Sequence, residues 1–327
     1  MTNLERSSDV KRLTDRIRGC LLGVAIGDAL GNPFEHMGPG PQKCAALEST
    51  GGLITDFHHG QDFPAGAWTD DTGLTLATCR ALIEVLKTYK TIDECIRSAY
   101  ESWAGSDESR KPGKTVLYAA KYGVPDINSW ANGAVMRISP VAIYAYLTRK
   151  NKRDTANLAY RVARTTHGHP LAVFPAVESA LALRSILYED ETVPEDLSDP
   201  GKYCDYLEPE KNARYPLYQK NRTVPIDQLE PSSGLWMWRY VFEQSLGLSE
   251  GAPWNCIPEF EPGILQVINQ GVDKDTAGAV AGALLGAYWG ESQLPEKWQS
   301  RVEKGAEILA LADEIILAVG DAVRSRG

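Results

Sequence analysis

Two apolar segments of this chain carry a glycine at every fourth position. One is "GCLLGVAIGDALG", residues 19–31, and the other is "GAVAGALLGAYWG", residues 278–290. Residues four apart share one face of a helix, so each segment is predicted to form a helix with a stripe free of side chains. Each glycine costs a helix interior about 1 kcal/mol relative to alanine, and a close backbone contact would offset that cost. We therefore expect two helices packed tightly in the centre of the protein, with acidic residues at their ends.

A glycine stripe is also typical of paired membrane helices. A membrane span needs about 20 apolar residues, whereas Asp28 interrupts the first segment and Asp275 and Glu291 bracket the second. The N-terminal residues "MTNLERSSDVKRLTDRIRG" contain no apolar core of a signal peptide. We expect no membrane contact and a cytoplasmic location.

Helical spacing of apolar residues dominates the rest of the chain, and alternating strand patterns are scarce. The predicted helices cover residues 72–89, 91–105, 140–150, 154–166, 172–189 and 304–325. The predicted fold is therefore an all-α globule that forms a single domain over residues 1–327. A net charge of -9 disfavours nonspecific binding to nucleic acid. The six cysteines are dispersed without a C-x-x-C pair, which argues against zinc-ribbon and thioredoxin-like sites.

Residues from about 191 to 233 differ from their surroundings because they are rich in proline, tyrosine and charge. A structureless loop of this length is unusual inside a compact domain and is often functional. We interpret the segment as an insertion or lid, with a surface excursion that has no role as the alternative.

Two acidic clusters, "TDDT" at 69–72 and "DKDT" at 273–276, each precede an apolar helical run. Taken alone, a cluster of this kind is explained as a helix N-cap. If the packed glycine helices bring both clusters together, their four carboxylates repel one another and raise one another's pKa values. Two divalent cations would balance four negative charges, and ligation by oxygen atoms alone suits Mg²⁺ or Mn²⁺. The sequence predicts a binuclear site on the condition that the clusters meet.

Five motifs in this order resemble the ADP-ribosylglycohydrolase family over residues 15 to about 298. They are "GDALGNPFE" (27–35), "WTDDT" (68–72), "NGAVMRISP" (132–140), "TTHGHP" (165–170) and "GVDKDTAGAVAGALLGAYWG" (271–290). The resemblance implies an all-α fold with two Mg²⁺ or Mn²⁺ ions in a central cleft. It also implies hydrolysis of the glycosidic bond at ribose C1 of an ADP-ribosylated protein, arginine-linked above all, with ADP-ribose as the product.

The resemblance also implies roles for individual residues. The metal ligands would be Thr69, Asp70, Asp71, Asp273, Asp275 and Thr276. The ADP-ribose pocket would be lined by Asn132, Gly133, Met136 and Arg137, with His167 close to the ligand. Glu35, Asp71 and Asp275 are the three candidates for the catalytic base.

Several alternatives to these assignments remain open. Helix packing would explain Met136, and a surface charge would explain Arg137. The whole chain would otherwise be a noncatalytic ADP-ribose-binding or crystallin-like structural protein, or a hydrolase of another ADP-ribose conjugate. The chain departs from the family pattern at Val272, where a second glycine is usual, and at Leu74, where many members have methionine.

Overall fold

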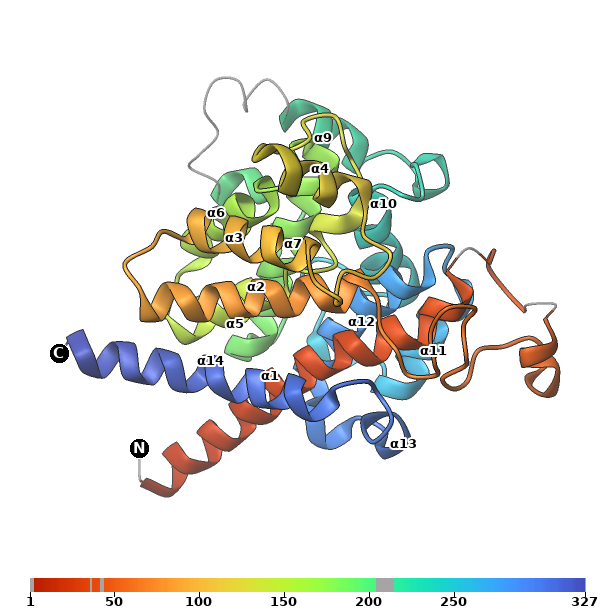
Figure 1. The fold of residues 1–327 in the computed structure, drawn as a ribbon, viewed down its shortest axis with the longest axis horizontal. Helices are drawn as coiled ribbons and strands as arrows, with labels where there is room; N and C mark the ends of the chain where they lie inside the picture. Colours follow the sequence, from red (N-terminus) through yellow and green to blue (C-terminus); the bar gives the residue numbers. More distant parts are fainter. Residues whose placement is uncertain (1–2, 36, 42–43, 204–214, 327) are drawn as a thin grey trace.

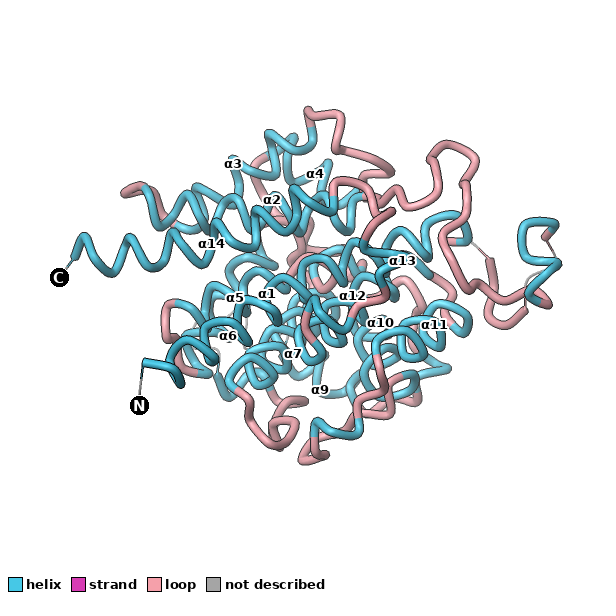
Figure 2. Tube along the Cα trace, turned by 90° about the horizontal axis from the view of Figure 1, so that it is seen from below, coloured by secondary structure: helices cyan, strands magenta, loops and turns pink. Residues whose placement is uncertain are grey.

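The computed structural model describes residues 3–35, 37–41, 44–203 and 215–326. Within these ranges the regular elements are all helices, and β contacts are confined to isolated bridges. Figure 2 shows helices joined by loops throughout the described chain. The all-α prediction is confirmed.

The α-helices are α1 (Asn3–Gly31), α2 (Asp70–Lys87), α3 (Ile92–Ala104), α4 (Lys114–Tyr122), α5 (Ser139–Leu147), α6 (Lys152–Arg164), α7 (Pro170–Tyr188), α9 (Tyr215–Arg222), α10 (Gly234–Arg239), α11 (Phe260–Gln270), α12 (Lys274–Trp289), α13 (Glu296–Gln299) and α14 (Gly305–Arg326). A π-helix spans Tyr240–Ser245. Each of the six ranges predicted from apolar spacing corresponds to one of these helices, with ends that differ by a few residues.

Helices α1 and α12 lie side by side and antiparallel in the middle of the molecule (Figure 1). A Cβ atom added to Gly27 would lie 2.0 Å from the carbonyl oxygen of Gly278, and one added to Gly23 would lie 2.2 Å from that of Gly282. No side chain fits at such distances, so the predicted close contact of the two glycine stripes is confirmed. The antiparallel arrangement brings the C-terminal end of α1 to the N-terminal end of α12.

Helix α2 begins at the same junction and packs against α3, α5 and α14. Helix α7 packs against α5, α6 and α10. Among the described residues, α7 is the one helix long and apolar enough to cross a membrane, but 83% of its most apolar stretch is buried inside the structure. Such burial identifies α7 as a core helix of this fold.

The described part of the 191–233 segment contains a short 3₁₀ helix (Pro200–Tyr203), α9 and a second 3₁₀ helix (Ile226–Gln228). Tyr218 of α9 is fully buried, and its ring lies 5.0 Å from that of Phe174 in α7. This part of the segment is thus attached to the core. Residues 204–214 lie outside the described residues, and a lid function stays a prediction.

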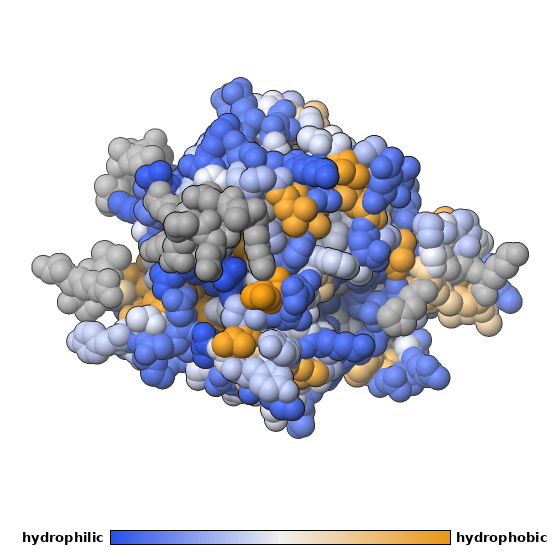
Figure 3. Space-filling view, turned by 90° about the horizontal axis from the view of Figure 1, so that it is seen from above, coloured by the Kyte–Doolittle hydropathy of each residue, from blue (hydrophilic) through white to orange (hydrophobic). Residues whose placement is uncertain are grey.

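The surface facing the viewer in Figure 3 is mostly hydrophilic, with hydrophobic residues in separate small groups. Most of the large apolar side chains instead form one cluster that extends from Ile17 in α1 to Ala318 in α14. Helices α1 and α12 both contribute to this core, which positions their acidic ends.

Candidate functional site

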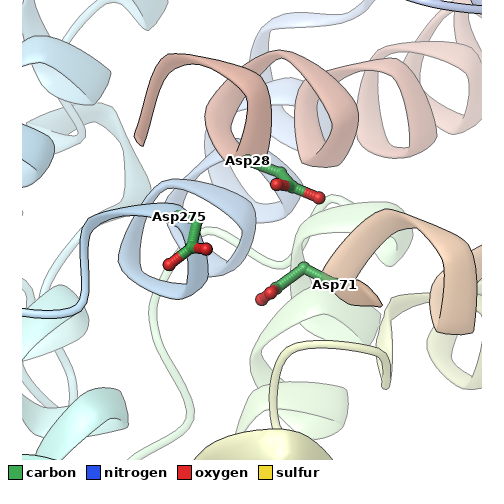
Figure 4. A group of neighbouring side chains, drawn as sticks. All are labelled: Asp28, Asp71 and Asp275. Carbon is green, nitrogen blue, oxygen red and sulfur yellow. The ribbon is translucent and has the colours of Figure 1, made fainter. Parts of the chain in front are cut away.

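Three aspartates from three helices meet where α1 ends and α2 and α12 begin. Carboxylate oxygens of Asp28, Asp71 and Asp275 lie within 4.8 Å of one another, and all three side chains are buried. Figure 4 shows them approaching from α1, α2 and α12 around one common space. The condition set by the sequence, that the two acidic clusters converge, is met by Asp71 and Asp275.

A second group of acids adjoins the first. Oxygen atoms of Glu35, Asp273 and Asp275 also lie within 4.8 Å of one another. Asp275 belongs to both groups and therefore connects them. Two adjoining sets of carboxylates with a shared member offer ligands for more than one cation.

Asp28 was not predicted as a member of the site, only as an acidic end of a glycine stripe. Its carboxylate accepts hydrogen bonds from the backbone amides of Thr69 (2.9 Å) and Thr72 (3.0 Å) and from both threonine hydroxyls (2.9 and 2.7 Å). Asp28 thus caps α2 from another helix, while the Thr69 side chain at the N-cap position makes no cap hydrogen bond. No local spacing could reveal this contact, because its partners lie 41 and 44 residues away.

The capping explanation of the acidic clusters does not describe their contacts. Asp273 occupies the N-cap position of α12 without a cap hydrogen bond from its side chain. Asp71 is buried, and its Oδ1 atom has no hydrogen-bond partner among the described residues. A buried carboxylate oxygen without a donor is costly, and a cation is the natural partner for it.

The electrostatics of the cluster also favour a bound cation. Burial raises the pKa of Asp71 well above its ordinary value, and the carboxylates of Asp28 and Asp70 raise it further. Burial, followed by repulsion from Asp273 and Asp71, also raises the pKa of Asp275. Burial and the nearby Asp28 raise the pKa of Asp70 to about 8. Without an added cation these groups favour their protonated forms.

The remaining predicted ligands lie beside these aspartates. The Thr69 hydroxyl lies 3.4 Å from Asp71 Oδ2, and the backbone amide of Thr276 donates to Asp275 Oδ1 at 3.0 Å. Asp70 is nearly buried and accepts a hydrogen bond from the Gly113 amide at 3.1 Å. All six predicted ligands therefore lie at the junction, and every donor atom that they offer is oxygen, which suits hard divalent cations.

Lys274 lies between two of these acids in sequence but does not neutralise them. It is fully buried, and its Nζ donates to the carbonyl oxygens of Ile268 (2.9 Å) and Gly271 (2.7 Å). Burial lowers the pKa of this ammonium group to about 8. The chain thus places a lysine at the site and directs its charge away from the aspartates.

Glu35 lies at the edge of the cluster and forms an ion pair with Lys111, whose Nζ is 2.9 Å from Oε2. The same ammonium donates to Asn32 Oδ1 at 2.7 Å. Lys111 has a φ of 46°, a left-handed conformation that a side chain-bearing residue rarely adopts. No sequence pattern predicts the role of Lys111, because this contact depends on the fold of the loop before α4.

The loop at Asn132 and Gly133 reaches the acids directly. The side-chain amide of Asn132 donates to Asp273 Oδ2 at 2.7 Å. A Cβ atom on Gly133 would lie 3.1 Å from the ring of His167, so glycine leaves the edge of the imidazole open. Met136 is buried, as packing would require, and its carbonyl oxygen lies 3.4 Å from the Thr75 hydroxyl.

Arg137 is fully buried, which excludes the surface-charge alternative. Its guanidinium donates to the Tyr100 hydroxyl at 2.8 Å and also to the Gly133 carbonyl and the Thr166 hydroxyl. These contacts tie together the two loops that carry Gly133 and His167. Arg137 therefore contributes to the site by fixing the positions of these two loops.

His167 is buried, and burial together with the nearby Arg137 lowers its pKa well below the ordinary value. Its Nδ1 lies 2.8 Å from the Thr166 hydroxyl, whereas Nε2 has no hydrogen-bond partner among the described residues. The structure thus holds a neutral imidazole in a fixed orientation, with one nitrogen atom left for a ligand.

Comparisons with known proteins show which family the chain resembles. The sequence profile of a family described as ADP-ribosylglycohydrolase matches residues 9–324. The ADP-ribosyl-[dinitrogen reductase] glycohydrolase of Rhodospirillum rubrum is 26% identical over 90% of this chain and 92% of its own length. The ADP-ribosylarginine hydrolase Tri1 of Pseudomonas putida is 28% identical over 92% of this chain and 78% of its own length.

Two further comparisons give similar coverage. The ADP-ribosylhydrolase ARH3 of Bos taurus is 24% identical over 93% of each chain. A solved structure described as an ADP-ribosylglycohydrolase-related protein complex matches with a TM-score of 0.70 and 25% identity, and the match covers 94% of this chain and 99% of that one.

Proposed function

The chain belongs to the ADP-ribosylglycohydrolase family, and we propose that it uses divalent cations to remove ADP-ribose from modified arginine side chains of proteins. The named relatives are hydrolases of ADP-ribose conjugates, so the chain is an enzyme of this class. Arginine as the linked residue is supported by the name of the Pseudomonas relative. The metal dependence is supported by the convergence of Asp71, Asp273 and Asp275 in two adjoining carboxylate clusters.

The residues at the junction fit Mg²⁺ or Mn²⁺ by their chemistry and by the buried, unpartnered oxygen of Asp71. Asp70, Asp71, Asp273 and Asp275 would hold two such ions together with the hydroxyls of the predicted threonine ligands. A bound cation would supply Lewis acidity that lowers the pKa of water and would neutralise the carboxylates. Asp28 already accepts hydrogen bonds on both oxygens, so we assign it the role of positioning α2.

Hydrolysis breaks the bond between ribose C1 and the side-chain nitrogen. Water supplies a hydroxyl group to C1, and one proton ends on the departing nitrogen. The transition state has oxocarbenium character, so it requires a nearby base and a rigidly held ribose. We assign Glu35 as the base, because its side chain is 24% exposed while Asp71 and Asp275 are buried. Its ion pair with Lys111 fixes the position of the carboxylate.

The rest of the ADP-ribose would be bound by neutral polar groups. Asn132 and Gly133 offer an amide and an open backbone, and His167 offers Nε2. A neutral imidazole adds no charge to a site that already contains several carboxylates. Arg137 does not contact the ligand in this assignment and instead holds the Gly133 and Thr166 loops together.

The test is the release of ADP-ribose from an arginine-modified peptide and from a serine-modified peptide, measured in Mg²⁺, in Mn²⁺ and after EDTA treatment. We expect turnover of the arginine linkage with either ion and none after EDTA. Asp275→Asn should lower turnover by at least roughly 100-fold, because loss of a cation ligand should cost at least as much as loss of a residue that only orients such ligands. Asp227→Asn, at an exposed position in a 3₁₀ helix, is the matched control and should keep full activity.

Other outcomes would redirect the assignment. Turnover that persists after complete removal of cations would overturn the metal dependence. Tight binding of ADP-ribose without turnover of any conjugate would make the chain a binding protein. Cleavage of the serine linkage alone would overturn the choice of arginine.

A further inference from the structure

In contrast to the acid cluster, a cavity between α3 and α6 is lined by three positively charged side chains. It has a volume of about 380 Å³ and is lined by Arg97 from α3 and by Arg161 and Arg164 from α6. Asp93 is the acid among its lining residues. Three guanidinium groups facing one carboxylate reverse, locally, the net charge of -9 that the whole chain carries. The electrostatics of this cavity therefore favour an anion.

Among the described residues, each arginine donates one hydrogen bond to the protein. Arg161 donates to Asp93 Oδ2 at 2.8 Å, Arg164 donates to the Gly168 carbonyl at 3.4 Å, and Arg97 donates to the Gly123 carbonyl. A guanidinium has five N–H donors, so these contacts leave donors for a ligand on every arginine. Because the side chains are already anchored and half-buried, binding costs less conformational entropy than it would for exposed arginines.

The other walls are apolar or neutral. Tyr160 is buried, and the guanidinium carbon of Arg164 lies 6.0 Å from the centroid of its ring. Pro125 and Thr165 complete the lining. Several converging guanidinium forks match an anion with many acceptor oxygens, which describes phosphate better than a single carboxylate. We propose that this cavity binds a small phosphate-bearing molecule at a site separate from the acid cluster.

The cavity adjoins the back of the loop that carries His167. Its lining residues Pro125 and Thr165 directly precede Asp126 and Thr166 in sequence, and the Asp126 amide donates to the Thr166 carbonyl at 2.9 Å. None of the residues assigned to ADP-ribose or to cations lines the cavity. A phosphate bound there would occupy a second site, distinct from the one assigned to ADP-ribose.

The test is calorimetric titration of the EDTA-treated full-length chain with inorganic pyrophosphate. EDTA removes the cations through which the acid cluster could bind pyrophosphate, so the signal reports on the arginine cavity. We expect saturable binding at one site and at least a tenfold weaker dissociation constant in the double variant Arg161→Ala, Arg164→Ala. Arg80→Ala is the matched control, because Arg80 also pairs with a single acid, Glu108 at 3.0 Å, and lies outside the cavity lining.

Asp93→Asn supplies a readout that misfolding cannot imitate. Removal of the one lining carboxylate should tighten pyrophosphate binding by roughly 2- to 5-fold, the range for one exposed charge pair. Absence of saturable binding to the unaltered protein would overturn the proposal. Equal affinity in the double variant would do the same, as would unchanged or weaker binding to Asp93→Asn.

Discussion

The protein buries carboxylates in two regions, which differ in whether cationic side chains pair with them. Fully buried Glu178 in α7 accepts hydrogen bonds from the Trp238 indole at 2.6 Å and from Arg222 at 3.3 Å. Arg222 also pairs with Glu243, which in turn pairs with Arg239. The chain thus supplies its own cations here, and the charges compensate one another.

The α1–α2–α12 junction contains more carboxylates and fewer cations. Among the described residues no lysine or arginine pairs with Asp71 or Asp275, and the buried Lys274 donates to carbonyl groups. A buried charge without a partner is costly, and we therefore propose that a cation from outside completes the junction. The Glu178 network stabilises the fold with its own ion pairs. At the junction, a bound cation would relieve the repulsion among the carboxylates.

The largest expected change in the free energy of unfolding concerns the network of Glu178 and Arg222. Arg222→Met leaves the Glu178 carboxylate buried without its cation, and loss of one partner from a buried pair costs about 3–5 kcal/mol. Denaturant unfolding of the metal-free chain measures this change in the free energy of unfolding. Lys87→Met is the control, because its pair with Glu314 is about half exposed and should contribute less than about 1 kcal/mol.

The same prediction can fail clearly. Burial raises the pKa of Glu178 to about 7 despite the presence of Arg222. If Arg222→Met lost less than about 1 kcal/mol, the network would not depend on charge compensation. Adding Glu178→Gln to Arg222→Met should recover part of the loss, since it removes the unpaired charge.

The next effect concerns the seam, the contact between the glycine stripes of α1 (Gly19–Gly31) and α12 (Gly278–Gly286), which brings the acids together. A Cβ atom in Gly282→Ala would lie 2.0 Å from the Gly23 carbonyl oxygen, so the two helices must separate. Overpacking against backbone should cost about 3 kcal/mol, the upper part of the usual range. It should also weaken stabilisation by added Mg²⁺, because α1 and α12 carry Asp28 and Asp275.

Gly105→Ala provides the matched control for the seam. A Cβ atom there would meet its nearest neighbour at 3.8 Å, which is ordinary contact, and the glycine has a φ of -95°. Its unfolding free energy should change by less than about 1 kcal/mol. Equal losses in both variants would show that the close contact between the helices does not matter.

The sequence predicted the seam because its signal is local. A glycine at every fourth position identifies one helix face, and two such faces are natural partners. The convergence of Asp71 with Asp275 could be stated only as a condition, since it depends on how α2 joins the seam. Asp28 could not be assigned at all, because its role is to accept hydrogen bonds from Thr69 and Thr72, which only the fold brings close.

The ion pairs of Glu178 could not be predicted from the sequence for a related reason. Glu178 stands in an apolar helix without a basic residue at helical spacing, and its partner Arg222 lies 44 residues away. Arg222 belongs to the 191–233 segment, whose composition suggested an insertion or lid. Composition describes how polar a segment is on average, whereas two individual side chains, Tyr218 and Arg222, attach this segment to α7.

The third prediction concerns cations and pH. Mg²⁺ or Mn²⁺ at 100-fold excess over its dissociation constant should stabilise the fold by about 2.7 kcal/mol. Asp71→Asn should remove this gain, and Asp227→Asn should keep it. Thermal unfolding with and without the cation measures both effects.

The sign of the pH dependence follows from the raised pKa values of Asp71 and Asp275 and from that of Asp70, about 8. Between about pH 4, the ordinary value for aspartate, and pH 8, the metal-free folded state retains protons that the unfolded state has released. The metal-free chain should therefore lose stability as the pH rises through this window. A cation requires the ionised carboxylates, so its stabilising effect should be larger at pH 8 than at pH 5. Equal gains at both values would contradict the comparison of the two regions.

The smallest effect should come from Lys111, the one chain-supplied ammonium paired with an acid at the junction among the described residues. The side chains of Lys111 and Glu35 are 35% and 24% exposed, so Lys111→Met should lower the unfolding free energy by less than about 1 kcal/mol. Removal of a positive charge beside the carboxylates should tighten cation binding by roughly 2- to 5-fold. Lys111→Arg, which keeps the charge, should bind cations as the unaltered chain does. If Lys111→Met instead bound cations more weakly, the hold on Glu35 would be part of the cation site, and the junction would resemble the Glu178 network more than we infer.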